Sequence, residues 1–157
     1  MKKTNKGFTL VELIVVLVIL AILAAILVPA LLGYIDNAMS KQTVLNARTA
    51  MIAAQAEMSS IYGTKSGLPS EITNDTHVGN IKNTADFTSL AWTEFSVGCK
   101  TTWTEKVAEK KDHHEAFTIV YVKYTDATGT VYFDGEQWSE TAPATTGLKV
   151  HTITSGT

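Results

Sequence analysis

The side chains that could ligate a metal ion fall into two groups in the second half of the sequence. Both groups consist of histidines and carboxylates: Asp112, His113, His114 and Glu115, and then Asp126, Asp134 and Glu136. Adjacent residues on a strand point to opposite faces, so His113 and His114 cannot readily share one ion. The second group lacks the close ligand spacing of a calcium-binding loop. We therefore expect a solvated loop at 112–115 and no metal site.

Other enzymatic chemistry has little support. The sequence has no glycine-rich phosphate loop, no Ser-His-Asp order with supporting motifs and no Cys-His cluster. Cys99 is the only cysteine, so it cannot form an intramolecular disulfide, and we expect a small buried hydrophobic residue. Trp92, Trp103 and Trp138 are expected in the core or in contacts with neighbouring molecules. No catalytic residue and no cofactor is predicted.

One carboxylate stands out because of its surroundings. Glu12 lies at the start of an apolar region in which residues 13–32 have no charged side chain. As a helix, such a run spans roughly 30 Å, the thickness of the hydrocarbon layer of a membrane. A charged side chain near the centre of such a helix costs about 2.5–3.5 kcal/mol on insertion scales. Glu12 therefore either has a partner or stays hydrated at headgroup level.

The start of the chain allows two interpretations. Lys2, Lys3 and Lys6 precede the apolar run, which predicts a cytoplasmic N-terminus and an exported remainder. An ordinary signal peptide, cut near Val28-Pro29-Ala30 to release a secreted enzyme that begins at Leu31, has the same basic start. The length of the run, the glutamate within it and the helical pattern beyond Pro29 argue against that alternative.

The residues Lys6-Gly7-Phe8-Thr9-Leu10-Val11-Glu12-Leu13 resemble the class III leader junction of type IV pilins and pseudopilins. The resemblance implies cleavage between Gly7 and Phe8 by a membrane prepilin peptidase, followed by N-methylation of Phe8. Glu12 matches the glutamate of the family that serves in assembly. It would neutralise the new amine of Phe8, which lies four residues away on the same helical face or on a neighbouring subunit.

These features divide the chain into three parts. We expect a leader peptide at 1–7, a transmembrane and filament-core helix at 8–34, and a globular pilin head at 35–157. Pro29 removes a backbone donor from the helix, so a bend or loosening is expected between Ala25 and Gly33. This segment is either a kink tolerated in lipid or a compliant joint used on entry into a filament. Without its three leader lysines the chain has ten basic and fifteen acidic residues, a net charge of -5.

Beyond Gly33 the pattern becomes amphipathic and predicts a second helical half. Apolar residues recur at steps of three and four, at Val44, Ala47, Met51, Ala54, Met58 and Ile61. The helix is predicted to end near Tyr62 and Gly63, with the glycine as C-cap. Residues 63–90 are polar and predict a long connecting segment, in which the pattern also allows a short helix over 85–90.

The last third of the chain predicts an antiparallel sheet of about four strands packed on the helix, an α+β fold. The strongest signal is a hairpin of residues 117–124 and 130–133, with further strands at 95–103 and 148–153 and a turn at 134–135. Depending on register, the residues that cover the helix belong to one of two sets: Phe117, Ile119 and Tyr121, or Val120, Val122 and Tyr124.

The resemblance implies a type IV major pilin that catalyses no reaction. Its expected partners are other copies of itself, the membrane, the peptidase and methyltransferase, and a pilus assembly platform; no nucleic-acid site is predicted. The subunit would wait in the cytoplasmic membrane and end in an extracellular pilus used for adhesion, twitching motility or DNA uptake. Lack of a C-terminal cysteine pair fits pilins of Gram-positive bacteria better. A pseudopilin of a secretion or competence system remains the alternative.

Overall fold

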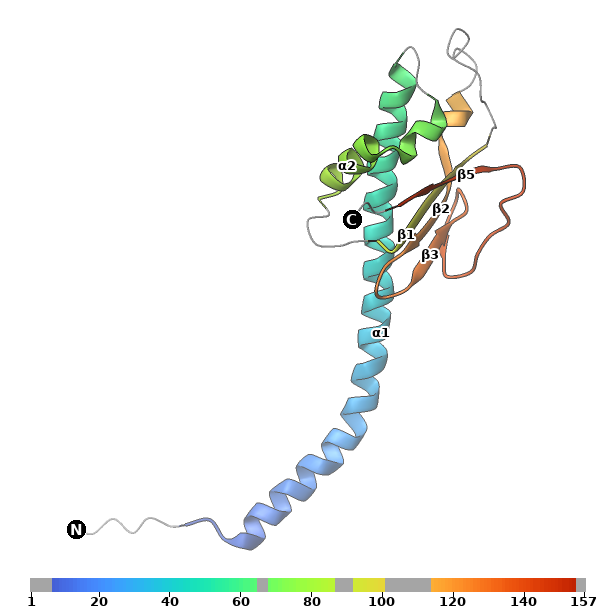
Figure 1. The fold of residues 1–157 in the computed structure, drawn as a ribbon. Helices are drawn as coiled ribbons and strands as arrows, with labels where there is room; N and C mark the ends of the chain where they lie inside the picture. Colours follow the sequence, from blue (N-terminus) through green and yellow to red (C-terminus); the bar gives the residue numbers. More distant parts are fainter. Residues whose placement is uncertain (1–6, 65–67, 87–91, 101–113, 155–157) are drawn as a thin grey trace, which may run out of the picture. The chain divides into compact units, whose positions relative to one another are not determined.

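The computed structural model describes residues 7–64, 68–86, 92–100 and 114–154 (Figure 1). These residues form an α+β fold. Its elements, in chain order, are α1 (Leu10–Gly63), η1 (Pro69–Thr73), α2 (Asp75–Thr84), β1 (Glu94–Cys99), η3 (His114–Phe117), β2 (Ile119–Thr125), β3 (Thr130–Phe133), β4 (Trp138–Ser139) and β5 (Lys149–Ile153). The chain divides into two compact units, Met1–Met39 and Ser40–Thr157, and each is described by itself.

The first unit contains the apolar half of α1. The helix is unbroken through Pro29 and Gly33, and every described side chain up to Met39 is solvent-exposed. No side chain here has a core to enter, because the sequence is apolar on all sides of the helix. The helix begins at Leu10, so Phe8 and Thr9 lie before it, two residues later than a helix starting at Phe8.

The second unit, the head, contains the amphipathic half of α1. The predicted stripe is confirmed: Ala47, Ala54, Met58 and Ile61 are buried, and Val44 and Met51 are partly buried against the core. α1 ends at Gly63 as predicted, but its cap differs. Gly63 does not adopt a positive φ; instead the Thr64 hydroxyl donates to the Ile61 carbonyl at 2.8 Å.

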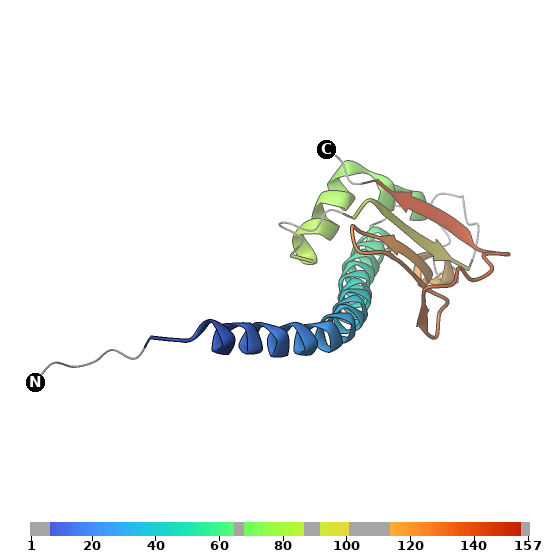
Figure 2. The same cartoon turned by 90° about the horizontal axis from the view of Figure 1, so that it is seen from below.

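The sheet has five antiparallel strands in the order β4-β3-β2-β1-β5, one more than predicted. The additional strand, β4, is only two residues long, too short to show an alternating pattern in the sequence. Viewed along the helix, the head half of α1 lies against one face of the sheet (Figure 2). Gln55 joins the two layers, because its amide group donates to the Phe117 carbonyl at 2.9 Å and accepts from the Ile119 N–H at 2.8 Å.

A β-bulge decides which residues of β2 face the helix. Gly98 pairs with Tyr121 but Cys99 pairs with Ile119, so Val120 is skipped and the side-chain alternation shifts. Ile119, Val122 and Tyr124 consequently face the core. Neither predicted set is right as a whole. Tyr121 is buried on the other face, over Gly98, where an added Cβ would lie 3.0 Å from the tyrosine Cβ.

The predicted connecting segment at 63–90 is wrong for residues 69–84. They form η1, with Pro69 in its first turn, and then α2. Ile72 is buried from η1, and Val78 and Ile81 are buried from α2 at helical spacing. Glu57 of α1 accepts hydrogen bonds from His77 at 2.6 Å and from Asn80 at 2.8 Å, which holds α2 against the long helix.

Other predictions are confirmed or lie outside the described residues. The hairpin, the 134–135 turn and the C-terminal strand are confirmed, and Gly135 adopts φ 99°, a conformation that suits glycine. Cys99 and Trp92 are core residues, and Trp138 packs against the core. The short helix allowed over 85–90, Trp103 with the end of its strand, and Asp112 and His113 fall wholly or largely outside the described residues.

His151 makes the stability of the head depend on pH. It is 8% exposed on β5, and among the described groups its Nε2 atom has no hydrogen-bond partner. Burial, and then the nearby charge of Lys149, lowers the pKa of His151 below its ordinary value. The unfolded chain therefore binds a proton at a pH where the folded head does not, and stability falls as the pH drops below about 6.5.

We expect the midpoint of urea unfolding of a 35–157 fragment to be lower at pH 5 than at pH 7.5. His151→Leu should reduce this difference, because leucine cannot be protonated. His114→Gln is the matched control, since His114 is exposed on η3. An unchanged pH dependence in His151→Leu would contradict the assignment.

Candidate processing and assembly site

The predicted scissile bond lies in open backbone directly before α1. Gly7, Phe8 and Thr9 are not helical, and Phe8 is 83% exposed. A Cβ built on Gly7 would meet no atom within 4 Å. The Gly7–Phe8 peptide is therefore free of helical hydrogen bonding and of side-chain cover, as a peptidase that must reach the backbone requires.

Thr9 and Glu12 together cap the start of the helix. The Thr9 backbone N–H and its hydroxyl donate to Glu12 Oε2 at 3.2 and 3.0 Å, and the Glu12 backbone N–H donates to Thr9 Oγ1 at 3.2 Å. This reciprocal arrangement is a capping box, which satisfies donors at a helix N-terminus that have no partner within the helix. The Glu12 carboxylate also lies at the positive end of the helix dipole, where negative charge is favoured.

The capping box changes the expected geometry of Glu12. In the precursor Phe8 is not helical, so the predicted four-residue pairing on one helical face does not exist before cleavage. Cleavage would create a positive amine next to the positive end of the helix dipole, one residue from the Thr9 N–H that Glu12 already holds. A carboxylate at this position offsets that unfavourable charge.

Thr9 is the site residue that the sequence reasoning missed. The signal was present, because Thr9-Leu10-Val11-Glu12 has the Ser/Thr-x-x-Glu spacing of a capping box before an apolar run. Pro29 and Gly33, the predicted joint, lie inside unbroken helix, where the Gly33 carbonyl accepts an additional hydrogen bond from the Asn37 side chain at 2.8 Å. The joint remains a prediction.

Residues 2–28 match the family motif described as the prokaryotic N-terminal methylation motif. The match includes the leader lysines, the Gly7–Phe8 junction, Glu12 and most of the apolar run. This is the N-terminus of a type IV pilin-like prepilin. Comparisons with curated proteins and with solved structures gave no match. The prepilin motif points to a structural protein, and the α+β fold with its long N-terminal helix is pilin-like.

The apolar half of α1 has the properties of a membrane anchor. Among the described residues it is the one helix long and apolar enough to cross a membrane, with a mean hydropathy of 3.3 over its most apolar window and none of that window buried. Together with the leader, this is consistent with anchoring of the prepilin in the membrane before assembly.

The remaining chemical candidates do not come together. Within the described ranges, no three His, Cys, Asp or Glu side chains are grouped closely enough to hold a metal ion. Burial raises the pKa of the Cys99 thiol to about 12, so the reactive thiolate is scarce at neutral pH. Asp134 accepts hydrogen bonds from the N–H groups of Glu136 and Gln137, which is a turn-stabilising role.

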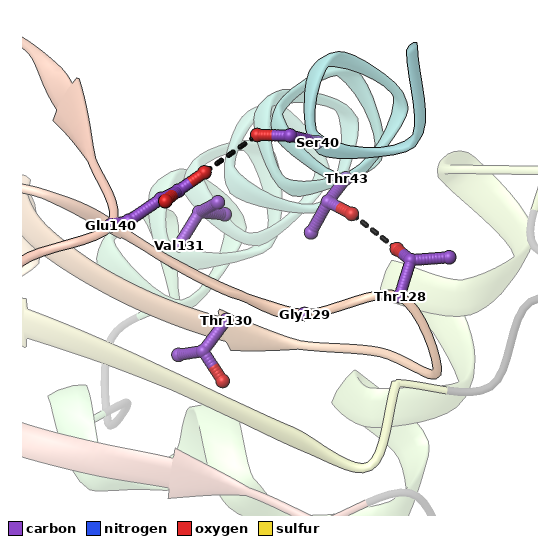
Figure 3. Close-up of a pocket in the computed structure, with 7 residues that line it drawn as sticks. All are labelled: Ser40, Thr43, Thr128, Gly129, Thr130, Val131 and Glu140. Atoms are coloured by element: carbon purple, nitrogen blue, oxygen red, sulfur yellow. Dashed lines mark hydrogen bonds between the residues drawn. The ribbon is translucent and has the colours of Figure 1, made fainter. Parts of the chain in front are cut away.

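A small polar pocket of about 210 Å³ lies where the head half of α1 meets the β2–β3 turn (Figure 3). Ser40 donates to Glu140 at 2.7 Å, and Thr43 shares a short hydrogen bond with Thr128. Behind the pocket, the buried Asp126 accepts hydrogen bonds from Thr128 and from the Gly129 N–H. The pocket walls thus hold the helix to the sheet, and Glu140 is the one charged residue that lines it.

Proposed function

We propose that this chain is the precursor of a type IV pilin, a structural subunit that polymerises into an extracellular filament. The supporting observation is the order of its parts: a leader junction with the methylation motif, an exposed capped helix start, and an unbroken apolar helix that continues into the head. The 1–7 leader is removed, residues 8–34 serve first as membrane anchor and then as filament core, and residues 35–157 form the head.

The proposed partners follow from these roles. A prepilin peptidase cuts Gly7–Phe8 on the cytoplasmic side and a methyltransferase modifies the Phe8 amine; an assembly platform then extracts the subunit from the membrane. Every side of the apolar half of α1 is exposed in the single chain, so further copies must cover it once lipid is left behind. The filament is accordingly a helical homopolymer.

The mature protein is expected to begin at Phe8 and to carry one added methyl group on its amine. Intact-mass analysis of the surface form, followed by N-terminal fragmentation, measures both changes. A chain beginning at Met1 would reject processing, and one beginning at Leu31 would identify an ordinary signal peptide.

We assign the chain as a major pilin of the Gram-positive type, because the sequence has no cysteine pair to close a C-terminal loop. Electron microscopy of sheared filaments, with mass spectrometry of their main component, tests this assignment. Long surface filaments made chiefly of this chain are the expected result. Presence of the chain in short, wall-spanning assemblies alone would identify a pseudopilin.

A further inference from the structure

The outward side of the head half of α1 carries an uncharged stripe that no part of the described head covers. Its members recur at steps of four, three and four: Leu45, Thr49, Ile52 and Ala56. Leu45 is 57% exposed and Ile52 is 64% exposed, on a helix whose opposite side is fully buried. The Thr49 hydroxyl donates to the Leu45 carbonyl at 3.0 Å, so its hydrogen-bonding capacity is already used within the helix.

A groove of about 460 Å³ adjoins this stripe, between α1 and strands β2 and β3. Ile52 belongs to both features, and Met51, Val120 and Phe133 supply further apolar walls of the groove. The stripe and the groove therefore form one continuous apolar surface on the head. A contiguous surface of this kind usually marks a place where another protein binds.

We propose that this surface receives the apolar half of α1 from a second copy of the chain. The inference rests on the proposed function, because it requires assembly outside the membrane. There, each copy brings a helix that is apolar on every side, and without lipid it must be covered by protein. Leu45 and Ile52, seven residues apart, extend that apolar surface along the same helix onto the head, so neighbouring copies can pack helix against helix.

Charge along the helix favours the same occupant. Between residues 8 and 56 the acidic residues are Glu12 and Asp36, and the basic residues are Lys41 and Arg48. Both basic side chains lie in the exposed helical turns around Leu45, and neither takes part in the ion pairs formed among the described residues. A second copy's helix brings apolar surface together with carboxylates of the opposite sign, which a purely lipid-like partner would not.

Cysteine protection tests the proposal in the full chain. Leu45→Cys and Ile52→Cys are each introduced and treated with a membrane-impermeant maleimide, in membrane-held subunits and in purified filaments. We expect labelling at least tenfold slower in filaments. Ser60→Cys is the matched control, because Ser60 is exposed on the same helix but lies about 80° around the axis from Ile52. Native Cys99 is fully buried and adds little background.

Ile52→Cys labelled as fast in filaments as in membranes would overturn the inference while leaving the filament assignment intact. Equal protection at Ser60→Cys would overturn it too, because burial would then not be specific to the stripe. If the unaltered chain forms no filaments, the proposed function itself fails. As a second measurement, Ile52→Asp should lower sheared filament protein at least fivefold relative to Ser60→Asp, with cleavage at Gly7–Phe8 unchanged in both.

Discussion

Replacing Glu12 by glutamine is expected to leave membrane insertion and cleavage intact and to reduce filament protein at least tenfold. Glutamine can make the same hydrogen bonds to Thr9, so the substitution preserves the capping box and removes only the charge. Two unit charges about 4 Å apart interact by roughly 4 kcal/mol at an effective dielectric near 20. Loss of one partner also leaves the Phe8 amine buried and unpaired in the filament core.

The measurement compares processed protein in membranes with protein sheared from cells. Thr9→Ala is the matched control, because it breaks the capping box and keeps the carboxylate; we expect a smaller assembly defect from it. Normal filament yield from Glu12→Gln would reject the proposed pairing with the Phe8 amine. Accumulation of unprocessed Glu12→Gln would instead show that the peptidase reads the carboxylate.

The features predicted correctly from the sequence are those set by local pattern. The long helix follows from an apolar run joined to a three-and-four repeat, and both continue without a break from Leu10 to Gly63. The β2–β3 hairpin follows from two β-rich segments around Asp126-Ala127-Thr128-Gly129. The processing site was equally local, because its residues are contiguous in the chain.

The features that were missed depend on contacts distant in sequence. α2 is short and mostly polar, and it is held by burial of Val78 and Ile81 and by hydrogen bonds to Glu57 of α1, none of which a local pattern reveals. The bulge that selects Val122 and Tyr124 for the core depends on pairing between β1 and β2. Side-chain alternation alone could therefore only offer two registers.

The polar contact between α1 and the sheet was also invisible in the sequence. Asp126 appeared only as a turn residue, and Thr43 only as a polar position between apolar ones. In the fold, Thr43 Oγ1 lies 3.4 Å from Asp126 Oδ1, and both side chains are buried. Eighty-three residues separate them. A buried carboxylate in a turn can be anticipated only when the element that covers it is known.

Asp126→Ala is expected to destabilise the head by about 2–4 kcal/mol. Oδ1 of Asp126 accepts from the Thr128 N–H at 2.8 Å, from the Gly129 N–H at 3.2 Å and from the Thr128 hydroxyl, so alanine leaves several donors without a partner. A hydrogen bond to a charged group contributes about 1.5–3 kcal/mol, and contributions to one carboxylate are not additive.

The pH dependence gives this prediction a second readout. Burial acts to raise the pKa of Asp126, but hydrogen bonds from Thr128 and Gly129 outweigh it and hold that pKa below its ordinary value. The carboxylate therefore stabilises the head fully above about pH 4, and the contribution is lost as the pH falls through the lower, folded-state pKa. Asp126→Ala should lower stability at pH 7 and remove part of the acid-dependent loss.

Urea unfolding of the 35–157 fragment at pH 7 and at pH 3 measures both effects. Asp134→Ala is the matched control, because Asp134 makes the same kind of turn hydrogen bonds, to Glu136 and Gln137, in a fully exposed position. Water can replace the lost acceptor there, so the effect should be clearly smaller. Equal destabilisation by the two substitutions would show that the turn hydrogen bonds alone matter, and that burial of Asp126 beneath Thr43 of α1 contributes nothing.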